Sequence, residues 1–217
     1  MLSSKRPPSF AGEEIPPGIT FFDLDHTLIT ANGSVLFGVY LYRQGKSSLL
    51  NSALILLVYL LKTMKIVSLL TLHRWSFRYL FKGKNKGEYL PLVRQQIAKD
   101  LPKYKSSLME PALQQALARG DVYLVSSSPD FIVQEYAAAF GFHGFQGTEY
   151  ATDHQGNFSH VEGLVDGAAK RDFARERARG LVSYAYSDDL TDAPLLGGVD
   201  FGYLVAKDSI SPFMRPL

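Results

Sequence analysis

The feature that most restricts the fold of this chain is an alternation of short apolar segments with helical ones. The apolar segments end in polar residues. The apolar segments lie at 19–24, 121–128, 181–189 and 200–206, and helical patterns occupy 34–105, 109–120, 129–141, 166–180 and 191–198. Strands that alternate with helices are typical of βαβ units. The sequence therefore predicts an α/β fold with a mainly parallel sheet, and a hairpin or loop at 145–162.

The residues that end these segments are rich in carboxylates and hydroxyls. Asp23 and Asp25 follow the first segment, Ser126 closes the second, and Asp188 and Asp192 follow the third. Ligands of open α/β sheets bind beyond the carboxyl ends of the strands, so we expect these groups to converge at one edge. Oxygen donors without sulfur favour Mg²⁺, and a cation would relieve the repulsion between Asp23 and Asp25.

The composition limits the available chemistry. The 217 residues include no cysteine, which excludes disulfides and thiol nucleophiles and suits a reducing compartment. Residues 1–17 lack the apolar core of a secretory signal, and we expect them to form a flexible leader. Residues 31–105 carry 13 Lys and Arg against Glu88 and Asp100, a charge of +11 that leaves −9 for the remainder. This split predicts an anionic partner that approaches the basic part.

Four motifs resemble those of the haloacid dehalogenase superfamily of phosphotransferases. The first, DxDx[TV], is DLDHT at 23–27, and the second, a Ser or Thr closing an apolar strand, is Ser126. The third, a lysine at the start of a helix, is Lys170, and the fourth, an acidic pair after a strand, is Asp188 with Asp192. The resemblance implies a Rossmann-like core at 18–33 and 106–217, with helices on both faces of the sheet. It also implies an inserted helical cap, basic and hydrophobic, at 34–105.

The same resemblance implies a Mg²⁺-dependent phosphatase that forms an aspartyl-phosphate. Asp23 is the expected nucleophile, and Asp25 is the expected general acid and base. The expected metal ligands are oxygen atoms, from Asp23, the backbone carbonyl of Asp25, and Asp188, with Asp192 in support. The groups expected to bind and neutralise the phosphoryl group are Thr27, Ser126 and Lys170.

Each motif also has an ordinary structural interpretation. Asp and Thr are common in turns, Ser126 could cap a helix, and Lys170 could be a solvated helix residue. The acidic cluster at 188–192 could compensate a helix dipole. It is the shared order of the four motifs that favours catalysis. His26, inside the first motif, is expected to point away from both aspartates and to pack against its surroundings.

The cap bears on the choice of substrate. Residues 26–87 contain no acidic residue, and Asn32 stands where phosphoserine phosphatases carry a glutamate for the substrate ammonium, so phosphoserine is disfavoured. The uncharged stretch 47–61 overlaps the start of the apolar and basic segment 49–86. It is shorter than the roughly 20 residues that a membrane span needs. Two interpretations stay open: a buried helical hairpin, or an interfacial segment that meets anionic headgroups.

Three functions are compatible with these features. The motif pattern most resembles the phosphoserine-phosphatase-like branch of the superfamily, with its subclass I helical cap. The preferred function is a phosphatase for an anionic lipid phosphate such as phosphatidylglycerophosphate, because phosphatidylglycerophosphatase C of that branch is similar in its hydrophobic, basic cap. The second is a soluble phosphatase for a sugar phosphate, nucleotide or histidinol phosphate. The third is a non-catalytic module that binds a membrane or nucleic acid. We expect a cytoplasmic protein that associates peripherally with the inner face of the membrane.

Overall fold

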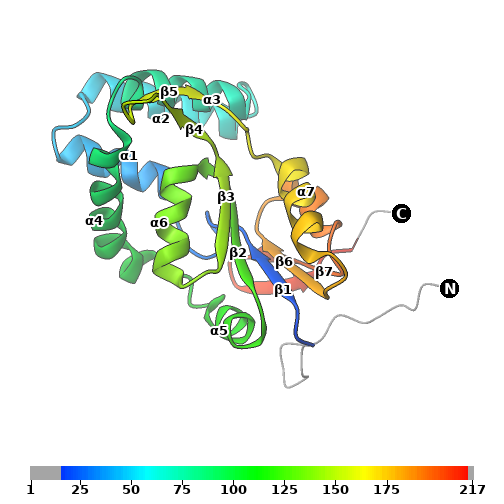
Figure 1. Ribbon diagram of the computed structural model, residues 1–217. Coiled ribbons are helices and arrows are strands. Elements are labelled where there is room, and N and C mark those ends of the chain that lie inside the picture. Colours follow the sequence, from blue (N-terminus) through cyan, green and yellow to red (C-terminus); the bar gives the residue numbers. More distant parts are fainter. Residues whose placement is uncertain (1–15, 215–217) are drawn as a thin grey trace.

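The computed structural model describes residues 16–214, so most of the predicted leader, residues 1–15, lies outside the described residues. Six strands form one sheet in the order β3-β2-β1-β6-β7-β8 (Figure 1). Five of these strands are parallel, and β8 is antiparallel to β7 at one edge. The strands are β1 (Ile19–Phe22), β2 (Val122–Pro129), β3 (Gly144–Thr148), β6 (Ser183–Ser187), β7 (Phe201–Ala206) and β8 (Ser209–Pro212).

Helices cover both faces of this sheet, as successive residues of β1 show. Phe21 and Phe22 are both fully buried, but they belong to two different clusters because side chains alternate along a strand. Phe21 packs with residues of α7 (Gly167–Ala178) and α8 (Ala193–Leu196). Phe22 packs in the cluster that contains α5 (Glu110–Arg119) and α6 (Asp130–Phe140). The predicted α/β, Rossmann-like fold is confirmed.

Two strands of the sheet were not predicted. Residues 145–148 belong to the predicted hairpin or loop, yet Gly144–Thr148 forms β3 and pairs parallel to β2. Ser209–Pro212 forms the antiparallel edge strand β8. Both lie at sheet edges and are partly exposed, so neither carries the continuous apolar run that marks a central strand. The predicted hairpin itself is present, formed by β4 (Tyr150–Thr152) and β5 (Phe158–Val161).

A helical insertion separates β1 from β2 and gathers at one end of the molecule (Figure 1). It contains α1 (Gly33–Arg43), α2 (Leu49–Thr63), α3 (Leu69–Ser76), the π-helical turn η1 (Phe77–Phe81) and α4 (Lys86–Tyr104). The β4–β5 hairpin, distant in sequence, packs against this insertion through aromatic rings. Phe81 lies 5.7 Å from Tyr150 and 5.6 Å from Phe158, measured between ring centroids.

The apolar helix α2 does not form the buried hairpin that was one of the two interpretations. Val58 is its only buried residue, whereas Leu50 is 77% exposed and Leu57 52% exposed. The interpretation fails because α2 contacts its neighbours α1 and α3 along one side and leaves the other side open. Among residues 16–214, no helix combines the length and hydropathy needed to cross a membrane.

Candidate active site

Asp23, Lys170 and Asp192 form a buried ion-paired group at the carboxyl edge of the sheet. The Lys170 ammonium donates to Asp23 Oδ1 and to Asp192 Oδ2, each at 2.6 Å. Asp192 Oδ2 also accepts from the Ser187 hydroxyl at 2.7 Å. Asp23 directly follows β1, Lys170 lies in α7 and Asp192 ends η2 (Leu190–Asp192), and each is at most 7% exposed. The structure thus brings together three residues that the motifs placed in one site.

The charges in this group do not balance. Burial disfavours the Lys170 ammonium, but Asp23 and Asp192 more than compensate, so the pKa of Lys170 is raised. Burial raises the pKa of Asp23 well above its usual range, and the charges of Asp192 and Asp25 add to this effect against the opposing lysine. One lysine cannot offset these neighbouring carboxylates, so the site has room for further positive charge.

Asp25 is held in place by the start of α1. Its Oδ1 accepts from the Gly33 N–H at 2.7 Å, and its Oδ2 accepts from the Asn32 amide at 2.9 Å and the Ser128 hydroxyl at 3.2 Å. Burial raises the pKa of Asp25 although the Gly33 N–H and the Ser128 hydroxyl oppose the shift. Gly33 lies so near that a Cβ there would sit 3.4 Å from Asp25 Oδ1.

Thr27 and Asp188 are paired with each other. The Thr27 hydroxyl donates to Asp188 Oδ1 at 3.3 Å and accepts from the Asp188 N–H at 3.0 Å. Burial raises the pKa of Asp188, an effect that the nearby His26 reduces. Thr27 is fully buried and lies outside the cavity lining, so this geometry supports a positioning role for Thr27 and does not support its predicted contact with phosphate.

The expected metal ligands are two side-chain carboxylates and a carbonyl, and their oxygen chemistry suits Mg²⁺. Asp23 and Asp188 both have a raised pKa that a cation would lower. Among the described residues, no three His, Asp or Glu side chains come together as a ready-made metal cluster. The donor set therefore fits an ion that takes its remaining ligands from water and substrate, as Mg²⁺ commonly does.

Ser126 and His26 also line the site. Ser126 is 1% exposed, and its hydroxyl accepts from the Ser128 N–H at 3.1 Å. His26 was expected to pack away from the aspartates, and this was wrong: it is exposed and lines the cavity. Its φ of +57° is the reason, because the left-handed conformation breaks the strand alternation on which the expectation rested.

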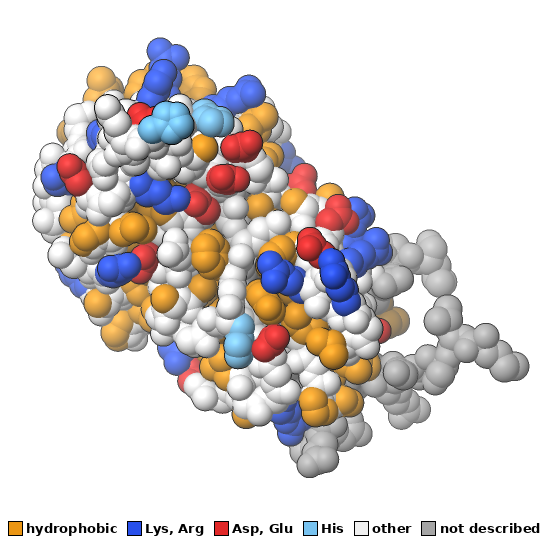
Figure 2. Space-filling view, in the orientation of Figure 1, with side chains coloured by type: hydrophobic (Ala, Val, Ile, Leu, Met, Phe, Trp, Pro, Cys, Tyr) orange, Lys and Arg blue, Asp and Glu red, His pale blue; other side chains and the backbone are white. Residues whose placement is uncertain are grey.

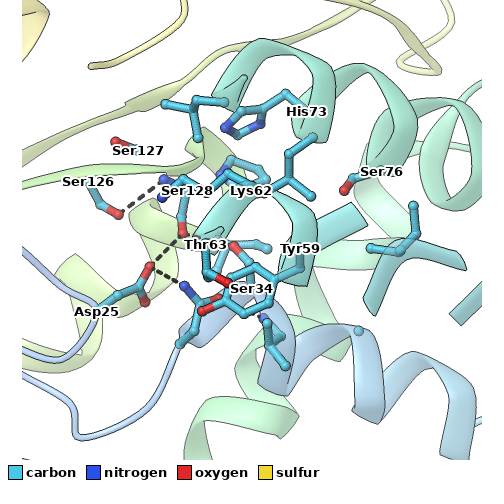
Figure 3. A pocket seen from close by; sticks show the side chains of 18 of the residues that line it. Asp25, Ser34, Tyr59, Lys62, Thr63, His73, Ser76, Ser126, Ser127 and Ser128 are labelled. Carbon is cyan, nitrogen blue, oxygen red and sulfur yellow. Dashed lines mark hydrogen bonds between the residues drawn. The ribbon is translucent and has the colours of Figure 1, made fainter. Parts of the chain in front are cut away.

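A cavity of about 910 Å³ joins these groups to the helical insertion. Figure 3 shows Asp25, Ser126 and Ser128 on one side, and side chains of α2 and α3 facing them from the other. Much of the remaining wall is apolar; its members include Val35, Val39, Leu49, Ile55, Leu56, Leu69, Leu72 and Leu80. His73 also lines the cavity, and burial lowers its pKa to about 4. The polar end at the sheet therefore continues into an apolar space under the insertion.

Several site residues were absent from the sequence prediction. Ser128 and Ser34 hydrogen-bond to each other at 2.8 Å and connect Asp25 to α1. Ser187 supports Asp192. The run Ser126–Ser127–Ser128 was a visible signal, but only its first member matched a motif. Asn32 had been noted for the glutamate it replaces, and its amide contact with Asp25 is new.

Comparisons with known proteins agree with this geometry. Residues 20–197 match the family model described as haloacid dehalogenase-like hydrolase. No curated protein sequence matches the chain. A solved protein of unknown function from Bordetella pertussis Tohama I is similar, with a TM-score of 0.72 and 18% identity over 85% of this chain and 88% of that one.

Two further solved structures share the fold. A HAD family hydrolase from Salmonella enterica serovar Typhi has a TM-score of 0.65 and 16% identity, over 86% of this chain and 62% of that chain. A phosphoserine phosphatase, solved as a phospho-aspartyl intermediate analogue, has a TM-score of 0.56 and 13% identity, over 85% and 84% of the two chains. At such identities the likeness concerns the fold alone.

Proposed function

The chain belongs to the haloacid dehalogenase-like hydrolases, and from this membership we propose that it is a Mg²⁺-dependent phosphatase of phosphomonoesters. One observation carries the proposal: Lys170 bridges Asp23 and Asp192 in a cavity that Asp25 and Ser126 also line. A phosphoryl group is an anion with several oxygens, and catalysis of its transfer depends on positioning and charge neutralisation. This cavity end offers a carboxylate, a fixed ammonium and a hydroxyl within one small space.

Asp23 is the proposed nucleophile. Its carboxylate oxygen would attack phosphorus while the ester P–O bond breaks, and Asp25 would give its proton to the departing oxygen. Water would then attack the aspartyl-phosphate, with Asp25 taking the proton from the water, so that inorganic phosphate leaves and Asp23 is restored. The raised pKa of Asp25 supports this role, because it favours a protonated acid nearer to neutral pH.

The proposed metal is Mg²⁺, held by Asp23, the backbone carbonyl of Asp25, and Asp188. When bound, it would supply positive charge next to the transferring phosphoryl group. Thr27 orients Asp188 through two hydrogen bonds, and Lys170 contacts both Asp23 and Asp192.

The proposed substrate is an anionic lipid phosphomonoester such as phosphatidylglycerophosphate. The apolar wall of the 910 Å³ cavity supports this choice, since a small polar ester would leave most of that wall without contact. Lys62 of α2 adds a positive charge to the lining. Asn32 carries an amide in place of a carboxylate, and this amide donates to Asp25. It therefore offers no negative charge to the ammonium of phosphoserine.

The test is phosphate release with and without Mg²⁺, from phosphatidylglycerophosphate in mixed micelles and from a panel of soluble phosphomonoesters. The variant Asp23→Asn should lose activity by roughly three orders of magnitude or more. Asp172→Asn is the matched control, because this carboxylate is 64% exposed and lies on the surface of α7.

Release from the lipid alone would support the proposed substrate. Release from a soluble ester alone would replace it with a small phosphomonoester and keep the proposed chemistry. Equal behaviour of wild type and Asp23→Asn would contradict catalysis and favour a binding module.

A further inference from the structure

The outer face of α2 is a continuous apolar surface. We use this name for Leu50, Leu57, Leu60 and Met64, together with Ile66 in the turn that follows. Their exposed fractions are 77%, 52%, 49%, 68% and 62%. The helical positions recur at spacings of seven, three and four residues, which places them on one side of the helix. Scattered exposed leucines are ordinary, but a full helical stripe of them indicates a partner.

The adjacent face of α2 lines the cavity. Ser52, Tyr59 and Thr63 line it, and Leu49 and Leu56 lie both in the lining and at the exposed surface. The helix α2 therefore contributes both to the outer apolar surface and to the lining of the cavity that contains Asp23 and Asp25. Whatever covers the outer face also lies next to the mouth of the cavity.

Basic residues border this apolar face. Arg43 and Lys46 are exposed just before α2, and the exposed Lys65 stands between Met64 and Ile66 just after it. From His26 to Gly87 the chain has nine Lys and Arg and no Asp or Glu. At the insertion end of the molecule, hydrophobic and basic side chains lie next to one another (Figure 2). A second copy that used the same face would bring the same positive charge, which disfavours a symmetric dimer through this face.

We propose that the outer face of α2 docks on a bilayer that contains anionic phospholipid. An apolar helical face with a basic border lies in the plane of a membrane interface, its leucines among the acyl chains and its lysines at the headgroups. No described helix could cross the bilayer, so the contact is peripheral. The consequence for catalysis rests on the proposed function: docking would place the cavity mouth beside lipid phosphomonoesters.

The experiment is vesicle flotation of the full chain. Vesicles of phosphatidylcholine alone are compared with vesicles of equal parts phosphatidylcholine and phosphatidylglycerol. Neither contains a phosphomonoester, so binding is independent of the active site. The wild type should float with the anionic vesicles, less so at high salt because screening weakens the basic border. The variant Asp23→Asn should float equally well.

The test variant is Leu57→Glu/Leu60→Glu, two residues of the outer face that do not line the cavity. Its partition into anionic vesicles should fall roughly tenfold or more, since two apolar contacts are replaced by charges that the headgroups repel. Leu181→Glu is the matched control: Leu181 is 55% exposed and precedes β6, so it lies at the amino ends of the strands, away from the cavity. Thermal unfolding verifies that each variant is folded.

Three results would overturn the proposal. One is that the folded wild type stays in the aqueous fraction with both vesicles, and another is that the α2 variant and the Leu181 control bind alike. The third is a wild-type dimer in light scattering that Leu57→Glu/Leu60→Glu disperses, which would assign the face to a second copy. Hydrolysis of p-nitrophenyl phosphate is measured in parallel, so loss of docking is told apart from loss of the proposed chemistry.

Discussion

Lys170 forms ion pairs with two buried carboxylates at once. Its ammonium lies 2.6 Å from both Asp23 and Asp192. A buried ion pair gains little over an apolar substitute, but removing one partner leaves an uncompensated charge. The same ion pairs that we propose for neutralising a phosphoryl group therefore also hold the end of β1 and η2 to α7.

Substitution of the lysine alone should be costly. Lys170→Met leaves Asp23 and Asp192 without their cation, and we expect the free energy of unfolding to fall by about 3–5 kcal/mol in urea titrations. Adding Asp192→Asn should restore part of the stability but none of the activity. Lys207→Met, at an exposed turn position, should change neither. A double variant no more stable than the single one would contradict this account.

At the scale of elements, α7 reaches η2 only because its first residue is glycine. A Cβ on Gly167 would lie 2.2 Å from the Thr191 carbonyl oxygen, a distance that real side chains do not adopt. This close approach sets Lys170, one turn further along α7, against Asp192. With any other residue at position 167, the start of α7 would lie further from η2 and Asp192.

Gly167→Ala should therefore separate α7 from η2. We expect a loss of roughly 1–3 kcal/mol in unfolding free energy, typical of overpacking, together with reduced phosphatase activity. Gly38→Ala is the matched control for stability alone, since Gly38 lines the cavity: nothing lies within 4 Å of a Cβ there, and α1 should gain slightly from alanine. Equal stability of the two variants would show that η2 moves aside freely.

His73 connects α3 to the hairpin and makes that contact sensitive to acid. Its Nδ1 lies 3.1 Å from the Tyr150 hydroxyl, and burial lowers its pKa from 6.5 to about 4. The unfolded chain gains a proton below pH 6.5 and the folded one does not until about pH 4. The free energy of unfolding is therefore not reduced by His73 at neutral pH, and it falls as the pH drops below 6.5.

Between pH 7 and pH 4, this linkage should remove roughly 3 kcal/mol of unfolding free energy. His73→Gln should flatten the dependence on pH, as followed by denaturant titrations at several pH values. The exposed His154→Gln should leave the wild-type slope unchanged. An unaltered slope in His73→Gln would assign the acid sensitivity to other groups.

At the scale of the whole molecule, the insertion and the sheet together create one cavity with two chemically different ends. The sheet contributes carboxylates and hydroxyls, and α1, α2 and α3 contribute most of the apolar wall. The acidic body and the basic insertion, with opposite net charges in the sequence, meet at this cavity. Under the proposed function, we therefore expect the insertion to determine substrate choice and the sheet to supply the chemistry.

Filling the apolar end should separate these two contributions. Ala53→Trp adds a large ring to the cavity wall, and we expect kcat/KM for phosphatidylglycerophosphate to fall roughly tenfold or more. Hydrolysis of p-nitrophenyl phosphate should change by less than about threefold, because a small ester needs only the polar end. Leu181→Trp is the control, because Leu181 lies outside both the cavity lining and the outer face of α2. Equal losses on both substrates would mean that the apolar end does not bind the lipid.

The sequence by itself determined the α/β class, the two central strands that end at Asp23 and Asp188, and the hairpin at 150–161. These follow from local patterns: apolar runs, turn residues and motif order depend on neighbours in the chain. It also indicated Asp23, Asp25, Ser126, Asp188 and Asp192 as one site, because carboxyl ends of parallel strands must share an edge, and the resemblance of the motifs added Lys170.

Only the tertiary structure decided the rest. The edge strands β3 and β8 carry weak patterns and exist through pairing with their neighbours. Ser128, Asn32 and Ser187 join the site through hydrogen bonds that no motif encodes. The exposure of α2 was undecidable from its residues, since an apolar helix is buried or exposed according to what packs on it. Burial and close approach are properties of contacts between distant segments, and a pattern along the chain does not contain them.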